Sequence, residues 1–196
     1  MEKSVIPLFT AYLRQYIDVS EKEVIRFLSF LSLKNFDKGS VIVREGDTAR
    51  YQFFVLKGQI IKIQTDDLGK EHVSQFSFEK SWIGNLQNYV SEKPSNCSLI
   101  ATEDCTLLLL SKNNYEKLLE QLPKAEKLFR MLFQNAYINQ SKRVSMMLMN
   151  DAETRLQLFI AEYPLLVDKI EWKYVASYLK MKPETLSRLK KKLHLI

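Results

Sequence analysis

The last seventeen residues of the chain carry the side chains best suited to bind a polyanion. Six basic residues stand there against one acidic residue, Glu184, and residues 111–196 have a net charge of +7 whereas residues 1–110 have −1. Such an asymmetry favours a nucleic acid or another polyanion as partner. A solvated basic tail would show the same charge, so the pattern around the charges has to decide between the two interpretations.

Residues 170–193 have the pattern of two short helices around a tight turn, with apolar residues at helical spacing between them. Pro183 suits the first turn of the second helix because its missing N–H needs no partner there. Arg188 can bridge O6 and N7 of guanine, Glu184 can accept from N4 of cytosine, and Ser, Thr and Lys can hold phosphates. The candidate DNA-binding residues are Lys182, Glu184, Thr185, Ser187, Arg188, Lys191 and Lys192. The alternative is an ordinary basic amphipathic helix, which would present a similar face.

Two kinds of segment precede this pair of helices. Short helices are expected at residues 4–17 and 20–28, where Ser20 and Glu23 form a capping-box pattern. From about residue 32 to 110, short β-rich runs alternate with turn residues. Many short strands with this spacing indicate an antiparallel sandwich or jelly-roll barrel.

After a short helix, apolar spacing predicts a long helix over 124–149, about 39 Å in length at 1.5 Å per residue. Its stripe includes Phe129 and Leu132, and a second copy of the chain is the simplest surface to cover them. Packing on the chain's own barrel is the alternative. We therefore expect an α+β chain with a barrel and N-terminal helices at 1–123, a dimerisation helix at 124–149 and an all-α helix-turn-helix domain at 150–196.

Composition limits the other classes of function. Hydrophobic residues make up 46% and charged residues 27% of the chain, as in soluble globular proteins. We expect a cytoplasmic protein with no membrane partner, because the sequence shows neither a long apolar span nor a secretory signal. Cys97 and Cys105 are too few for a four-cysteine metal site and are expected in the core. No nucleophile motif, His–carboxylate pair or Gly-rich phosphate loop is evident, so we expect no enzyme and no metal site.

The sequence resembles the Crp/Fnr family of transcription regulators over about residues 20–196. The stretch VASYLKMKPETLSRLKK is similar to the helix-turn-helix of that family, and GSVIVREGDTARYQFFVLKGQI resembles the first strands of its cyclic-nucleotide-binding-type barrel. The resemblance implies a homodimer joined by the long helix, with paired recognition helices in successive major grooves of double-stranded DNA about 34 Å apart. It also implies base-reading or phosphate-binding roles for Glu184, Ser187 and Arg188.

Two features depart from the family's helix-turn-helix. Lys180 stands where the family usually has Gly in the turn, and a non-Gly residue in a left-handed conformation costs on the order of 1 kcal/mol. The sequence given also ends at Ile196, without residues for a full β-wing after the recognition helix. We therefore expect DNA binding to be weaker or to depend more on the lysine cluster.

The resemblance also suggests where an effector would bind. Members that bind cyclic nucleotides use Gly-Glu-Leu and, about ten residues later, Arg-Ser or Arg-Thr, the Glu for the ribose and the Arg for the cyclic phosphate. The matching stretches here are Gly84-Asn85-Leu86 and Ser95-Asn96-Cys97, which lack both charged anchors. Binding of cAMP is disfavoured, because an unpaired buried charge costs about 3–5 kcal/mol.

Such a pocket could hold another small molecule, or it could be filled by the protein's own side chains. Its expected lining is Gly84, Asn85, Leu86, Ser95, Asn96, Tyr137, Gln140 and Ser141. We predict a homodimeric, sequence-specific DNA-binding transcription regulator of Crp/Fnr type that does not respond to cAMP and whose effector is unknown. The alternative is a small-molecule-binding module whose C-terminal helices contact another protein instead of DNA.

Overall fold

The computed structural model describes residues 5–164 and 169–195. Its first helices are α1 (Val5–Leu13) and α2 (Glu21–Leu28). The predicted capping box starts α2: the backbone N–H of Glu23 donates to Ser20 Oγ at 3.3 Å, and the Glu23 carboxylate accepts from the backbone N–H of Ser20 at 2.8 Å. The bond from the Ser20 backbone and a further bond from Lys124 lower the pKa of Glu23 to about 2.

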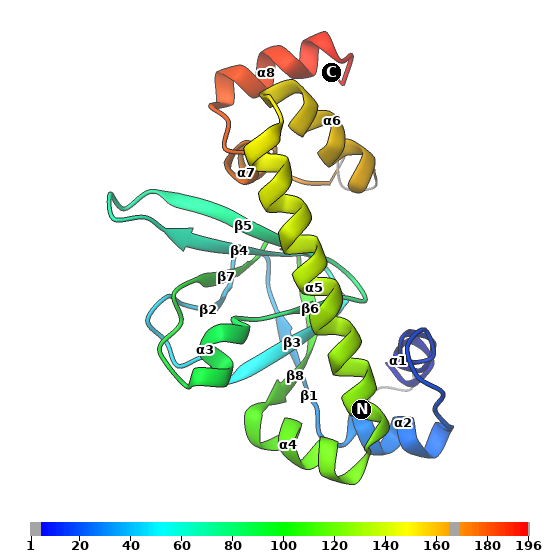
Figure 1. The fold of residues 1–196 in the computed structure, drawn as a ribbon. Helices are drawn as coiled ribbons and strands as arrows, with labels where there is room; N and C mark the ends of the chain where they lie inside the picture. The colour runs from blue at the N-terminus through cyan, green and yellow to red at the C-terminus, as the bar shows by residue number, and fades with distance from the viewer. Residues whose placement is uncertain (1–4, 165–168, 196) are drawn as a thin grey trace.

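The strands form two antiparallel four-stranded sheets, with strand orders β1-β8-β3-β6 and β2-β7-β4-β5 (Figure 1). Their bounds are β1 (Ser32–Phe36), β2 (Val41–Val43), β3 (Tyr51–Lys57), β4 (Ile60–Thr65), β5 (Glu71–Ser77), β6 (Trp82–Ile83), β7 (Ser98–Ala101) and β8 (Cys105–Ser111). This order confirms the predicted α+β class with an antiparallel jelly roll. Two short elements that the sequence analysis did not foresee lie between β5 and β7, namely β6 and the helix α3 (Leu86–Ser91).

The helices that follow the barrel are α4 (Lys112–Gln121), α5 (Lys124–Met149), α6 (Ala152–Glu162), α7 (Trp172–Tyr178) and α8 (Pro183–Lys192). Helix α5 has the predicted bounds and runs along the barrel from the N-terminal helices to α6, α7 and α8, which we call the C-terminal helices (Figure 1). Asp151 starts α6 by accepting from the backbone N–H of Thr154 at 2.8 Å. None of the helices in the described part of the chain is long and apolar enough to span a membrane.

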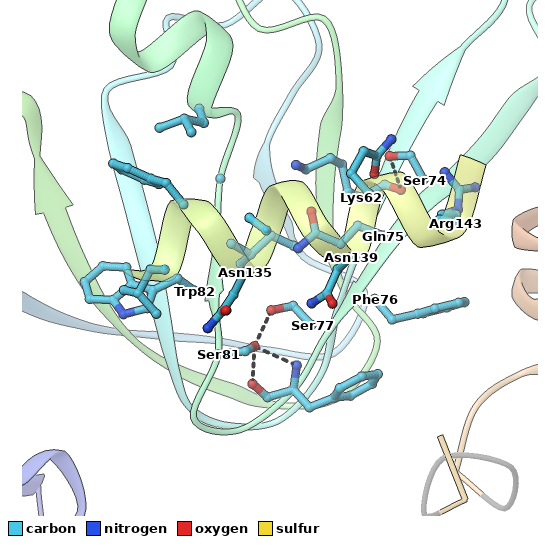
Figure 2. Close-up of a pocket in the computed structure, with 18 of the residues that line it drawn as sticks. Lys62, Ser74, Gln75, Phe76, Ser77, Ser81, Trp82, Asn135, Asn139 and Arg143 are labelled. Carbon is cyan, nitrogen blue, oxygen red and sulfur yellow. Dashed lines mark hydrogen bonds between the residues drawn. The ribbon is translucent and has the colours of Figure 1, made fainter. Parts of the chain in front are cut away.

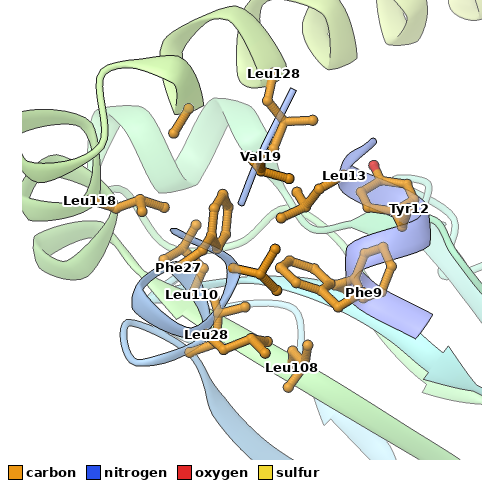
Figure 3. Close-up of a cluster of buried hydrophobic side chains, with 14 of the residues drawn as sticks. Phe9, Tyr12, Leu13, Val19, Phe27, Leu28, Leu108, Leu110, Leu118 and Leu128 are labelled. Atoms are coloured by element: carbon orange, nitrogen blue, oxygen red, sulfur yellow. The ribbon is translucent and has the colours of Figure 1, made fainter. Parts of the chain in front are cut away.

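A first hydrophobic cluster joins the N-terminal helices, the outer faces of β3 and β8, and the first half of α5 (Figure 3). Phe9, Phe27 and Leu128 are fully buried in it. Phe129 is 5% exposed, and Leu132 packs against the same cluster. The sequence analysis expected these two α5 residues at a dimer seam. Phe129 belongs instead to the core of one protomer and Leu132 is half-buried against it, because the first half of α5 covers its own barrel.

A second cluster fills the barrel between the sheets, and both cysteines are buried and free, as expected. A third cluster joins the C-terminal helices to the outer face of β4 and β5, where Phe76 contacts the rings of Phe159 and Tyr178. The backbone N–H of Val73 also donates to Ser177 Oγ at 2.9 Å. The C-terminal helices are therefore packed on the β4–β5 hairpin.

Candidate DNA-binding surface and ligand cleft

The second helix of the predicted helix-turn-helix is anchored by its apolar side. Leu186 in α8 is 3% exposed and packs in the same cluster as Val175, Ala176 and Leu179 around α7. The turn between the helices is closed by a bond from the backbone N–H of Met181 to the carbonyl of Ala176, at 2.9 Å. Because Ala176 is small, the two helices can approach closely at this point.

Lys180 adopts the left-handed conformation that the sequence analysis inferred for the turn, with φ of 52°. The family pattern has Gly there because Gly enters this region at no steric cost. Lys182 then precedes α8 with an extended backbone, and Pro183 occupies the first turn. The left-handed residue therefore lies in the turn between α7 and α8, and the proline lies at the start of α8.

Six of the seven candidate DNA-binding residues are exposed: Lys182, Glu184, Ser187, Arg188, Lys191 and Lys192. Thr185 is half-buried. Lys192 is directed back to α6, where its Nζ lies 2.6 Å from a carboxylate oxygen of Glu153. Helix α8 lies at the end of the molecule away from α1 and α2 (Figure 1), so the barrel does not cover this face.

The segment that would hold a cyclic nucleotide is closed on itself by hydrogen bonds. The side-chain amide of Asn85 donates to Ser95 Oγ at 3.2 Å and to Asn96 Oδ1 at 2.7 Å, and its oxygen accepts from the backbone N–H of Asn88 at 3.3 Å. Ser95 Oγ in turn donates to the carbonyl of Cys97 at 2.7 Å. These hydrogen bonds hold Asn85, Ser95 and Asn96 to one another, and the three residues contribute no cation for a phosphate.

A cleft of about 880 Å³ lies beside this segment, between α5, the strands β4 to β6 and the C-terminal helices. Its size is in the range of small-molecule sites. Of the predicted pocket residues, Gly84, Leu86 and Gln140 line it. Asn85, Ser95 and Asn96 do not, because their polar atoms point into the hydrogen-bonded segment behind the cleft.

Tyr137 and Ser141 also lie outside the cleft, which differs from the expected lining. The lining residues of α5 in this stretch include Asn135 and Asn139 (Figure 2). Tyr137 follows Asn135 by two positions and is therefore about 200° further around the helix. Its side chain is 76% exposed on the opposite face. The sequence predicted the helix but not which of its faces turns toward the barrel. Because the sequence of α5 is partly polar, two of its faces could have turned inward.

Lys62 is a cleft residue that the sequence analysis missed. It lies in β4 and lines the cleft together with Gln75 of β5 (Figure 2). Burial lowers the pKa of Lys62. A lysine inside the apolar run IIKI was the signal that could have identified it, because a charged residue is rare at a core-facing strand position.

Arg143 of α5 lines the end of the cleft nearest the C-terminal helices. Its guanidinium donates to the carbonyl of Val73 at 3.4 Å and to that of Tyr178 at 3.2 Å, and it lies 4.3 Å from the centre of the Tyr178 ring. Burial raises the pKa of Tyr178, although the nearby Arg143 opposes this effect. Arg143 thus connects α5, β5 and α7 at the cleft.

Comparisons with known proteins support this description of the fold. Residues 33–122 match the family model of the cyclic nucleotide-binding domain. A comparison with curated protein sequences finds no match.

Several solved structures are similar along most of the chain. The c-di-GMP responsive global regulator CLP of Xanthomonas campestris is 16% identical, with a TM-score of 0.69 over 90% of this chain and 92% of its own. FixK2 of Bradyrhizobium japonicum is 16% identical, with a TM-score of 0.70 over 84% and 85%. The catabolite activator protein of Thermus thermophilus is 22% identical, with a TM-score of 0.56 over 90% and 84%. The chain therefore shares its fold with these regulators, and its barrel matches the cyclic nucleotide-binding domain.

Proposed function

We propose that the chain is a cytoplasmic, homodimeric transcription regulator of Crp/Fnr type that binds specific sites in double-stranded DNA. In this proposal, residues 1–123 sense an effector, residues 124–149 form the dimer helix and residues 150–196 bind DNA. The observation that carries it is the face of α8, which is anchored by buried Leu186 and exposes Glu184, Ser187, Arg188 and Lys191. Such a helix can lie in the major groove, where Arg and Glu discriminate between bases.

The exposed face of α5 supports the homodimer. Phe133, Tyr137, Ser141, Val144 and Leu148 follow one another at intervals of three or four residues, and all are exposed. These five residues are called the outer stripe; Tyr137, Ser141, Val144 and Leu148 do not line the cleft, whereas Phe133 lies at its border. This spacing is typical of a helix that pairs with another helix. A second copy of the chain would bury the outer stripe against itself about a two-fold axis.

The self-bonded segment around Asn85 supports an effector other than cAMP. A cyclic phosphate at Ser95 would meet hydroxyl and amide groups but no guanidinium, and its desolvated charge would remain unpaired. The effector would bind in the neighbouring cleft. Because CLP is described as c-di-GMP responsive, cyclic di-GMP is a suitable test ligand beside cAMP.

The experiment is selection of binding sites from random DNA duplexes, followed by anisotropy measurements on the selected and a scrambled site. We expect tighter binding to the selected site and a fall in affinity with salt of roughly 0.9 log units per log unit of salt for each phosphate contact. Lys127→Ala is the control, because it removes an exposed basic residue of α5 outside the C-terminal helices. It should leave the affinity unchanged.

Binding that shows no site preference and no salt dependence, or no binding to any duplex, would contradict the proposal. That outcome would favour the other class of function, a small-molecule-binding module whose C-terminal helices contact a protein. Adding cyclic di-GMP or cAMP in the same assay tests the effector: we expect no change of DNA affinity with cAMP.

A further inference from the structure

Lys62 occupies a position in the fold where an apolar residue would be expected. Successive side chains of a strand alternate between its two faces. In β4, Ile61 and Ile63 belong to the outer cluster with the C-terminal helices, whereas Ile60 belongs to the cluster inside the barrel. Lys62 therefore faces the interior with Ile60. Its ammonium forms no salt bridge with a carboxylate in the described parts of the chain.

Positive charge predominates among the groups that line the cleft. Lys62, Lys80, Lys142 and Arg143 line it, and Glu162 is the one carboxylate residue among the described lining residues. An enclosed cation without a partner is unfavourable for folding. Lys62 is therefore better explained by a ligand that supplies the missing negative charge than by a contribution to stability. Burial lowers the pKa of Lys62, as expected for an ammonium partly withdrawn from water.

The cleft also presents hydrogen-bonding groups that have no partner within the described chain. The buried atoms Gln52 Nε2, Trp82 Nε1, Tyr89 Oη and Arg143 Nε lack hydrogen bonds, and all four residues line the cleft. The amides of Gln75, Asn135 and Asn139 add donors and acceptors from the strands and from α5 (Figure 2). Buried polar groups in native proteins are normally paired, so this set points to a polar ligand.

We propose that the cleft binds a small organic anion whose phosphate or carboxylate group contacts the Lys62 ammonium, while the remainder of the ligand hydrogen-bonds to the cleft amides. The anion would be held by a cation of β4 instead of by the loop that follows α3, where Ser95 and Asn96 provide none. This inference rests on the proposed function in one respect, that the anion would be the effector of the regulator.

The test titrates the full chain with inorganic pyrophosphate and, separately, with citrate at constant ionic strength, following the lysine ammonium signals by NMR. At least one anion should shift the Lys62 signal saturably and raise the pKa of Lys62, because a nearby negative charge favours the ammonium form. Binding of pyrophosphate alone assigns a phosphate ligand, and binding of citrate alone assigns a carboxylate ligand. Lys62→Met should weaken the binding at least tenfold.

Two control variants separate the cleft from other basic surfaces. Lys142→Met removes a more exposed lysine of the same cleft and should weaken the binding less than Lys62→Met does. Arg188→Ala removes a cation of α8 and should not affect the Lys62 signal. An unshifted Lys62 signal with both anions, or a Lys62→Met variant that binds as tightly as the wild type, would overturn the proposal.

The melting temperature without anion gives an independent measurement. Removing an unpaired, enclosed charge while keeping the volume of the side chain should leave the melting temperature of Lys62→Met equal to or above that of the wild type. A clear decrease would show that Lys62 is a structural residue and would count against the proposal. Failure of the wild type to bind DNA would overturn the proposed function but not the anion site, because the titrations contain no DNA.

Discussion

At the scale of single residues, we expect the exposed face of α8 to divide base reading and phosphate binding between different side chains. Arg188 and Lys191 are three positions apart and therefore share this face. Arg188→Ala should weaken binding to the selected site by about 1–3 kcal/mol and blur the base preference, since arginine contacts guanine edges. Lys191→Ala should weaken binding to selected and scrambled sites alike. Anisotropy titrations on both sites measure this difference, and equal losses for both variants on both sites would refute the division.

Lys180 has a backbone conformation that glycine adopts more easily than lysine. Its φ of 52° is unfavourable for a side chain with a Cβ atom. Lys180→Gly should therefore stabilise the protein by about 0.5–1 kcal/mol, after allowing for the greater freedom of Gly in the unfolded chain. Thermal unfolding measures the change. The control is Lys191→Gly in α8, which should destabilise the protein by about 1 kcal/mol because glycine is unfavourable inside a helix. A similar loss of stability in Lys180→Gly would show that the left-handed conformation of Lys180 is not strained.

At the scale of elements, one face of α5 packs on the barrel, and the outer stripe is exposed in the protomer. Val144→Glu or Leu148→Glu should give a folded monomer, because each places a charge in the proposed seam and neither residue is buried in the protomer. Sedimentation velocity measures the state of association. Phe129→Glu should instead unfold the chain, since Phe129 is a core residue.

The control for the outer stripe is Ile25→Glu, which changes an exposed apolar residue of α2 that does not belong to the outer stripe. It should sediment as the wild type does. If the wild type is itself a monomer at micromolar concentration, or if Leu148→Glu remains a dimer, the outer stripe is not the interface.

Local signals determined which elements could be predicted. The capping residues Ser20 and Asp151 fix helix starts through bonds to residues three positions away, so their pattern is visible in sequence. The helix α3 was missed because its segment LQNYVS carries β-prone residues and is held by Asn85, whose other partners lie ten or more residues away. The same reason applies to the cleft. Its lining combines β4, β5, α5 and α6, and the relative placement of these elements comes from packing between them.

At the scale of the whole molecule, the C-terminal helices are not a separate body joined by a linker. They share a hydrophobic cluster with the β4–β5 hairpin, and the cleft opens beside this contact. A ligand that changes the distance between α5 and the hairpin would therefore also act on α7, and through α7 on α8. If the proposed effector binds in the cleft, this contact connects its site with the proposed DNA-reading face.

Arg143 is the residue on which that route depends, because it donates from α5 to Val73 of β5 and to Tyr178 of α7. Arg143→Met should loosen α7 from the hairpin while keeping much of the side-chain volume. Hydrogen bonds to a charged group contribute about 1.5–3 kcal/mol, so the amide of Val73, now bonded to Ser177, should exchange with solvent roughly ten- to hundredfold faster. Hydrogen exchange of β5 and α7 measures this change. The control is Lys142→Met, which changes an exposed residue next to Arg143 and should leave the hydrogen exchange of β5 and α7 unaltered. If Arg143→Met exchanged like the wild type, the aromatic contacts alone would hold the C-terminal helices in place.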